Sequence, residues 1–159
     1  MLEFNEQGLL IPNTVIASSI DELRHHFVEK IPTITRTENF EKYLRYSTEL
    51  KRLLNEKSIR QWVNGSFVTK LQNPNDIDIL TFINYELVAE LKIALDSFGV
   101  KGAWKIFGVD AYILEVYPET HPNYFFYKSD LAYWMDKFGK TKRDMGGKRN
   151  RKGFLEIIY

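Results

Sequence analysis

Two short apolar segments joined by a polar loop occupy the middle of the sequence, between Gln61 and Ile83. The segments Trp62–Asn64 and Asp76–Ile83 are rich in β-branched and aromatic residues and are bounded by Asn, Gly and Pro. Short apolar runs of this composition between turn residues are typical of buried strands. We therefore expect two strands of one sheet here, with the rest of the chain arranged around them.

The second segment begins with two aspartates, Asp76 and Asp78. Side chains two residues apart on a strand point to the same face, so the two carboxylates are forced together. At that separation they repel each other, and a raised pKa or a bound cation relieves the repulsion. Carboxylate oxygens suit a hard divalent cation. The pair therefore predicts a metal site for Mg²⁺, with Mn²⁺ as an alternative.

The loop between the two segments opens with Gly65 and Ser66. Glycine adopts a positive φ readily and lets a ligand approach the backbone, while Ser66 offers a hydroxyl and an N–H at the start of a short helical turn. This arrangement predicts a phosphate site facing the metal site. The alternative is purely structural: Asn73–Asp76 forms a turn that Asp76 caps, and Asp78 is a solvated residue at the edge of the strand.

The combination of Gly65-Ser66, a spacer and Asp76-Ile77-Asp78 resembles the signature of the DNA polymerase β-like nucleotidyltransferase superfamily, over roughly residues 40–117. The resemblance implies that the two aspartates and a third carboxylate hold two Mg²⁺ ions on a nucleoside triphosphate, whose β/γ-phosphates the Gly-Ser turn binds. The wider pattern of GSFVT, PNDIDI and KGFLEIIY is similar to small bacterial nucleotidyltransferase-like proteins related to abortive-infection toxins.

The resemblance places the third carboxylate on a later strand. The alternating segment Asp110–Tyr117 is predicted as that strand, and Asp110, at its start, is the expected third metal ligand. Glu115 is the competing candidate, although it lies deeper in the apolar alternation. Asp110 can also be an ordinary turn residue after Gly108.

The remaining pattern predicts an α/β (α+β) fold, a minimal nucleotidyltransferase fold in which a mixed sheet is flanked by helices and preceded by an N-terminal helical extension. Ser19 and Glu22 form a capping box that opens the first helix. We expect a single domain (1–159), divided into an arm and helix (1–36), a core (37–138) and a basic loop with a final strand (139–159). The expected helices span 19–30, 38–55, 85–98 and 129–138, and the other extended segments are an edge strand within 8–12, 104–107 and 154–159.

The amino-acid composition excludes several kinds of site and of protein. With 44% hydrophobic residues the chain can build a core, and with no cysteine it has no disulfides, thiolate zinc sites or cysteine nucleophiles. The three histidines lack ligand-like spacing. No apolar run approaches the length of a transmembrane helix, and no signal peptide precedes the domain, so we expect a cytoplasmic protein without a membrane partner.

Charge is concentrated near the end of the chain. The formal net charge is only +1, but the segment from Lys137 to Lys152 holds eight basic residues and one acidic residue, a net +7. Tethered at both ends, this segment is predicted to be a mobile flap that meets a triphosphate or an RNA backbone. The chosen phosphate-binding residues are Lys148 and Arg149, together with Lys70 in the spacer; Lys142, Arg143, Arg151 and Lys152 are alternatives. The aromatic run 124–127 is expected to pack under the sheet.

Three functions follow from these features. The preferred one is a Mg²⁺-dependent nucleotidyltransferase that moves a nucleoside monophosphate onto an RNA or protein hydroxyl, in a toxin–antitoxin or phage-defence setting. The second is a weakly active or inactive module of the same fold that binds nucleic acid or a protein through the basic loop. A metal nuclease built on Asp76, Glu90 and Lys92 is disfavoured, because Glu90 and Lys92 would point about 200° apart around a helix.

Overall fold

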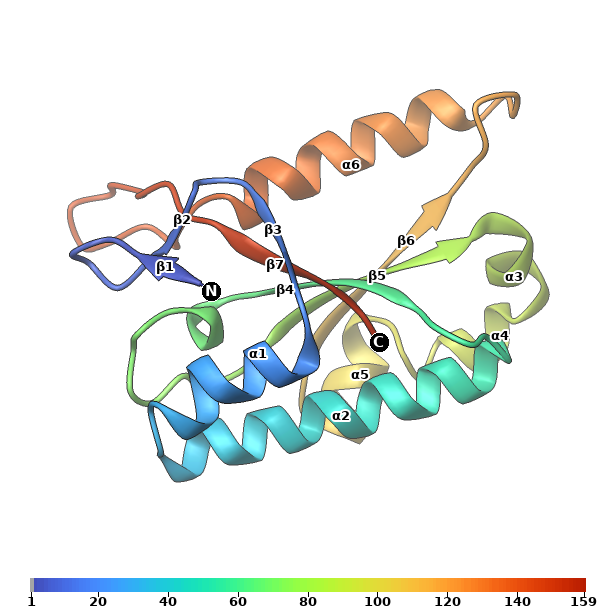
Figure 1. Cartoon of the computed structure of the whole chain (residues 1–159). Helices are drawn as coiled ribbons and strands as arrows, with labels where there is room; N and C mark the ends of the chain where they lie inside the picture. Colours follow the sequence, from blue (N-terminus) through green and yellow to red (C-terminus); the bar gives the residue numbers. More distant parts are fainter. Residues whose placement is uncertain (1) are drawn as a thin grey trace.

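The computed structural model describes residues 2–159, which form a five-stranded mixed sheet surrounded by helices (Figure 1). The strand order is β3-β7-β4-β5-β6; β7 pairs parallel with β3 and antiparallel with β4, and β5 pairs antiparallel with β4 and parallel with β6. The predicted α/β class is therefore confirmed. The strands are β3 (Val15–Ser18), β4 (Arg60–Asn64), β5 (Asp78–Asn84), β6 (Asp110–Val116) and β7 (Phe154–Ile158), and a separate hairpin joins β1 (Glu3–Phe4) to β2 (Leu10–Ile11).

Helices cover both faces of this sheet. Helix α6 (Tyr124–Phe138) lies alone on one face, and α1, α2 and α5 lie on the other (Figure 1). The remaining helical elements are α1 (Ile20–Arg24), the π-helix η1 (His25–Glu29), α2 (Ile34–Leu54), the 3₁₀ turn η2 (Ser66–Val68), α3 (Tyr85–Glu90), α4 (Lys92–Leu95) and α5 (Val100–Phe107). No helix within residues 2–159 combines the length and apolar character that crossing a membrane requires.

The two faces hold separate hydrophobic cores. The larger core lies under α2, whose buried residues include Phe40, Tyr43 and Leu50, at the helical spacing that the sequence predicts. The smaller core lies under α6 and is largely aromatic, with Trp62 against Phe82 and Phe154.

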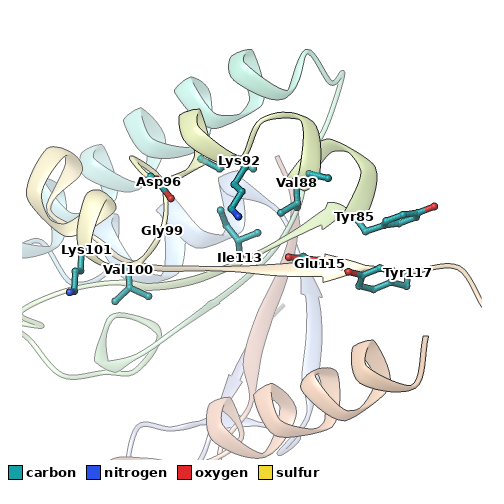
Figure 2. Close-up of a pocket in the computed structure, with 12 residues that line it drawn as sticks. Tyr85, Val88, Lys92, Asp96, Gly99, Val100, Lys101, Ile113, Glu115 and Tyr117 are labelled. Atoms are coloured by element: carbon teal, nitrogen blue, oxygen red, sulfur yellow. Dashed lines mark hydrogen bonds between the residues drawn. The ribbon is translucent and has the colours of Figure 1, made fainter. Parts of the chain in front are cut away.

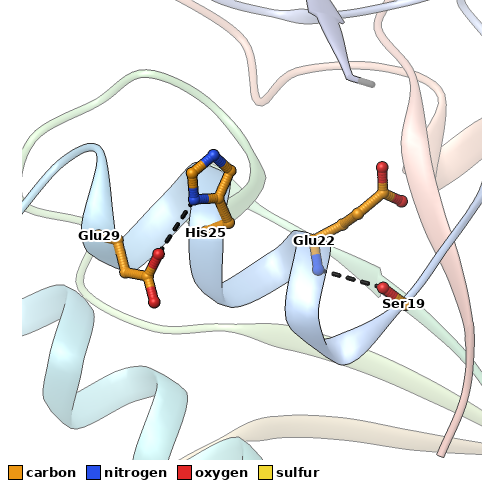
Figure 3. A network of polar contacts seen from close by, with 4 residues as sticks. All are labelled: Ser19, Glu22, His25 and Glu29. Carbon is orange, nitrogen blue, oxygen red and sulfur yellow. Dashed lines mark hydrogen bonds and ion pairs between the residues drawn. The ribbon is translucent and has the colours of Figure 1, made fainter.

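The predicted N-cap of the first helix at Ser19 is confirmed. The Ser19 hydroxyl accepts the Glu22 N–H at 3.1 Å, and the helical path continues through η1, where His25 Nδ1 and Glu29 Oε2 are 3.0 Å apart (Figure 3). The long second helix begins earlier than the predicted residue 38. Its N-cap is Thr33, whose hydroxyl accepts the Arg36 N–H, so the first turn of α2 lies before the apolar repeat that marked the helix in the sequence.

Two segments around α5 differ from expectation. Trp104–Phe107 was predicted to be extended but belongs to α5, because Ala103 and Phe107 are buried at helical spacing and Gly108, at φ 72°, ends the helix in the left-handed conformation. The predicted helix 85–98 is interrupted at Leu91, whose φ of −98° and ψ of 16° separate α3 from α4.

Helix α6 also begins earlier than predicted. It starts at Tyr124, five residues before the Ser129 that was expected to cap it, so the aromatic run 124–127 forms its first turn. Consecutive side chains on a helix point in different directions, and only part of such a run can face the sheet. Phe125 and Phe126 are 75% and 63% exposed, which corrects the expectation that this run packs under the sheet.

Candidate carboxylate site

Two of the predicted metal ligands lie side by side. Asp78 and Asp110 are the first residues of β5 and β6, and the parallel register of these strands pairs them directly. Asn64, the last residue of β4, is paired with Asp78 from the other side. Three neighbouring strands therefore place an amide and two carboxylates at one end of the sheet, on the face that carries Leu80 and α6.

The electrostatics of this cluster centre on Asp78. Burial, together with the charges of Asp110 and Asp76, raises the pKa of its carboxyl group to about 7, while Lys142 acts in the opposite direction. Desolvation and like charges both disfavour the ionised form of a carboxyl group. A cation bound here would relieve both effects.

Asp76 lies outside the strand to which it was assigned. Strand β5 begins at Asp78 rather than at residue 76, and Asp76 belongs to the loop before it, although its charge still acts on Asp78. Among residues 2–159, no three acidic or histidine side chains converge closely enough to hold an ion by themselves. The donor chemistry nevertheless fits Mg²⁺, which proteins commonly bind through one or two carboxylates, with water and substrate phosphate as the other ligands.

The Gly65-Ser66 turn is adjacent to this cluster. Gly65 has the predicted positive φ, 85°, and a Cβ added to it would overlap Oδ2 of Asp78. The close approach that requires glycine here is therefore made by a carboxylate of the protein. Ser66 begins the short helical turn η2, as predicted; it is partly exposed, and its hydroxyl has no hydrogen-bond partner within residues 2–159.

A buried lysine completes the polar cluster. Lys152 is 3% exposed, its ammonium group donates to Oδ1 of Asn64, and burial lowers its pKa to about 8, an effect that the charge of Asp78 opposes. Sequence reasoning named Lys152 only as one of several alternatives. Its position two residues before Phe154, on the alternation of β7, is the signal that places it on the α6 face.

The three basic residues that the sequence predicted to bind phosphate, Lys70, Lys148 and Arg149, lie away from the carboxylate cluster. The Lys70 ammonium is 5.0 Å from the centre of the Phe4 ring, at the N-terminal hairpin. Lys148 and Arg149 are exposed; the Lys148 N–H donates to Asp144, and the charge of Arg149 acts on Asp136. Instead, the charge of Lys142 acts on Asp78, and Lys152 and Asp78 interact electrostatically.

The basic segment forms an irregular hairpin rather than an open loop. The N–H of Thr141 donates to the Asn150 carbonyl at 2.9 Å, and the N–H of Lys152 donates to the Gly139 carbonyl at 3.0 Å. Nearer the tip, Asp144 N–H donates to the Lys148 carbonyl at 2.9 Å. These cross-strand bonds place Lys152 at the base of the hairpin and Lys148 near its tip.

Arg36 holds the spacer between the Gly-Ser turn and the aspartates, and nothing in the local sequence indicated it. Its side chain is fully buried, and its guanidinium group donates to the carbonyl oxygens of Phe67 at 2.8 Å, Thr69 at 2.7 Å and Leu71. Asn39, one turn further along α2, donates to the Pro74 carbonyl at 2.9 Å. The first turns of α2 thereby fix the path of the chain from Ser66 to Asp76.

An aromatic wall borders the carboxylates on the α6 side. The Tyr112 hydroxyl donates to Oδ2 of Asp110 at 3.1 Å, and the Tyr112 ring is 4.5 Å from that of Trp134 on α6. The Lys137 ammonium lies 4.6 Å from the Tyr112 ring centre. Burial and the charge of Asp110 raise the pKa of Tyr112, so its hydroxyl stays protonated and orients Asp110.

Two alternative carboxylates lie away from the cluster. Glu115 is an odd number of residues from Asp110 and so points to the opposite face of β6, where it is exposed. Glu90 ends α3, which follows the far end of β5 from Asp76 (Figure 1). The arrangement that would revive the nuclease hypothesis is therefore not formed.

The fold and the cluster define an α/β protein with a polar site at one end of its sheet, built from carboxylates, a buried lysine and a glycine turn. The chain belongs to a family described as a family of unknown function (DUF6932), whose model matches residues 2–158. No curated protein and no solved structure matches it.

Proposed function

We propose that this protein is a Mg²⁺-dependent nucleotidyltransferase. The observation that carries the proposal is the pairing of Asp78 with Asp110 beside the Gly65-Ser66 turn. This juxtaposition brings together the acidic and phosphate-binding elements of the superfamily that the sequence resembles. The family to which the chain belongs is described as one of unknown function, so the proposal rests on the site and on this resemblance.

The reaction transfers a nucleoside monophosphate. An acceptor hydroxyl gives up its proton to solvent, its oxygen bonds to the α-phosphorus of a nucleoside triphosphate, the bond from that phosphorus to the bridging oxygen breaks, and pyrophosphate leaves. Asp78 and Asp110, with Asp76 beside them, would hold Mg²⁺, which when bound neutralises phosphate charge and lowers the pKa of the acceptor hydroxyl. The Ser66 hydroxyl is available to donate to a phosphate, and Lys142 supplies an exposed positive charge near Asp78.

The acceptor we favour is RNA. The hairpin that carries Lys142 also carries most of the +7 segment, and a run of exposed basic side chains suits a phosphate backbone more than a neutral protein surface.

Titration with Mg²⁺ and each nucleoside triphosphate, followed by transfer of label from the α-phosphate to RNA, tests the proposal. We expect wild type to bind at least one triphosphate and Asp78→Asn to lose both binding and transfer. Asp130→Asn, a matched change at an exposed residue of α6, should retain both. Absence of triphosphate binding by wild type, or equal binding by Asp78→Asn, would overturn the proposal.

The second candidate function is binding of nucleic acid without catalysis. The exposed side chains of Lys148 and Arg149 on the hairpin favour it. RNA binding that weakens steeply with salt yet is unchanged by Mg²⁺ and by Asp78→Asn would support this function over transfer.

A further inference from the structure

Strand β6 forms one edge of the sheet, and its outer side has no strand partner within residues 2–159. Along a parallel strand, the N–H and C=O of one residue point to the same side, and successive residues alternate. The Asp110 N–H donates to the Ile77 carbonyl on the β5 side at 3.1 Å. The backbone groups of Ala111, Ile113 and Glu115 therefore face outward.

This edge lacks the features that usually keep sheet edges from pairing. Such edges are commonly short, interrupted by proline or rich in charge. The opposite edge, β3, has four residues, whereas β6 has seven residues and no proline, and Glu115 is the one charged residue among those that face outward. The β6 edge is therefore long and regular enough to accept another strand.

Grooves lie on both sides of the edge, and the groove on the α5 side has mainly apolar walls. The groove on the α5 side has a volume of about 860 Å³ and includes Val100, and the groove on the α6 side has a volume of about 340 Å³ and includes Phe126. Ile113 and Glu115 line both grooves. Val100 and Phe126 are 52% and 63% exposed, so large apolar side chains flank the edge on each face of the sheet.

Opposite charges stand at the two ends of the larger groove. Figure 2 shows Lys101 beside Val100 at one end of β6, and Glu115 beside Tyr117 at the other. A two-fold axis through the middle of the strand exchanges these ends, so the Lys101 end of one copy would lie beside the Glu115 end of another. The edge is therefore complementary in charge to itself.

We propose that two copies of the chain form a dimer through this edge, with β6 antiparallel to β6 and Ile113 on the two-fold axis. In this register Ile113 lies opposite its own equivalent, and Ala111 lies opposite Glu115 of the second copy. Each of these residues faces outward, so each pair exchanges N–H···O=C bonds and the two sheets become continuous. Val100 and Phe126 add apolar contact on the two faces, and Lys101 meets Glu115 of the second copy at each end.

Single cysteines test the register, because the chain has no cysteine of its own. Residues opposite each other in a hydrogen-bonded antiparallel pair have Cα atoms about 5.5 Å apart, within the range of a disulfide. Under mild oxidation Ile113→Cys should form a covalent dimer. Ala111→Cys alone should not, whereas a mixture of Ala111→Cys and Glu115→Cys should cross-link. Cross-linking of Ala111→Cys alone, or none at Ile113→Cys, would overturn the register.

Sedimentation equilibrium tests the interface itself. Wild type should dimerise in a concentration-dependent manner, and Lys101→Glu or Glu115→Lys should each raise the dissociation constant about tenfold, because each sets like charges opposite one another. The double variant should recover the wild-type value, and Lys57→Glu, an exposed change in the turn before β4, should leave it unaltered. A wild-type monomer at submillimolar concentration, or a double variant no better than either single one, would overturn the proposal.

Discussion

The two faces of the sheet solve the burial of polar groups in different ways. On the α2 face, the buried Gln61 side chain accepts from Tyr43 and Ser47 and donates to Thr81, all at 3.0 Å. Every group in that network is neutral and satisfied. On the α6 face, Asp78 and Lys152 are ionisable groups whose burial shifts the pKa of each toward its neutral form.

This difference suggests that the α2 face stabilises the fold, whereas the α6 face is suited to binding a ligand. A satisfied neutral network specifies one packing of α2 on the sheet. The carboxylates on the α6 face repel one another, so that face holds free energy that a bound cation or a proton can release. Arg36 on α2 carries a charge, but its hydrogen-bonding capacity is likewise satisfied, because carbonyl oxygens surround the buried guanidinium group. Perturbing the α2 face should therefore unfold the protein, whereas perturbing the α6 face should change its ligand binding.

The largest expected effect is that of Arg36→Ala. The change leaves the carbonyl oxygens of Phe27, Phe67 and Thr69 without their donor and empties the space that the side chain fills, so we expect a loss of about 3–4 kcal/mol in the free energy of unfolding. Urea denaturation measures it. Arg52→Ala, an exposed change on the same helix, is the control and should cost less than about 0.5 kcal/mol. Equal losses of stability in the two variants would contradict the structural role that we assign to Arg36.

Gly65→Ala tests the contact between the glycine turn and Asp78. The added methyl group overlaps the Asp78 carboxylate and must adopt a positive φ, so we expect a loss of about 2 kcal/mol in stability together with weakened triphosphate binding. Denaturation and titration on the same preparation separate the two effects. Gly147→Ala also has a positive φ but no neighbour within 4 Å, so its loss should be smaller and its binding unchanged.

The pH dependence of stability isolates the α6 face. The folded-state pKa of Asp78 is about 7, above its ordinary value of 3.8, so the folded protein favours the protonated form. That stabilisation is fully present below the unfolded-state value and disappears as the pH rises through 7. We expect the free energy of unfolding to fall by about 2–3 kcal/mol between pH 5 and pH 8, and Asp78→Asn to be flatter over this range. An equally steep profile in Asp78→Asn would assign the titration to another group.

The smallest effect on stability is expected for the tip of the basic hairpin. Lys148→Ala/Arg149→Ala should change the free energy of unfolding by less than about 0.5 kcal/mol, because both side chains are exposed. RNA binding should weaken by about 1 kcal/mol and lose part of its dependence on salt. Lys142→Ala, nearer to Asp78, should weaken triphosphate binding more than the double variant does. The reverse order would place the phosphates at the hairpin tip.

The parts of the site that follow from local pattern were predictable. The strand pattern predicted that Asp78 opens a buried strand, and a Gly-Ser pair between apolar runs predicted both the positive φ of Gly65 and the helical turn at Ser66. Asp110 was chosen because the resemblance to the superfamily calls for a third carboxylate at the start of a later strand, and the structure pairs it with Asp78. Arg36 was not predictable in this way, because its carbonyl partners on the spacer lie more than thirty residues further along the chain. Lys152 contacts Asn64 across 88 residues, and only the position of β7 in the sheet brings them together.

The helices that were misjudged have a similar explanation. The start of α6 at Tyr124 was missed because the aromatic run 124–127 was expected to pack under the sheet. Tyr127 packs against the core on the α6 face, whereas Phe125 and Phe126 are exposed. Trp104 is a residue type that favours strands, but Ala103 and Phe107 are buried against α2 at helical spacing, and the segment forms a helix. In both places tertiary contacts outweigh the preference of the residues themselves.

The position of β7 has a consequence for how the protein is made. The last strand along the chain lies between β3 and β4, so β3 has no place in the sheet until residues 154–158 have left the ribosome. Lys152 lies two residues before this strand and reaches Asn64 and Asp78 when the strand pairs. A nascent chain that ends before it carries the aspartates without their buried lysine, and so synthesis produces the acidic half of the site first and completes its charge balance only with the closing strand.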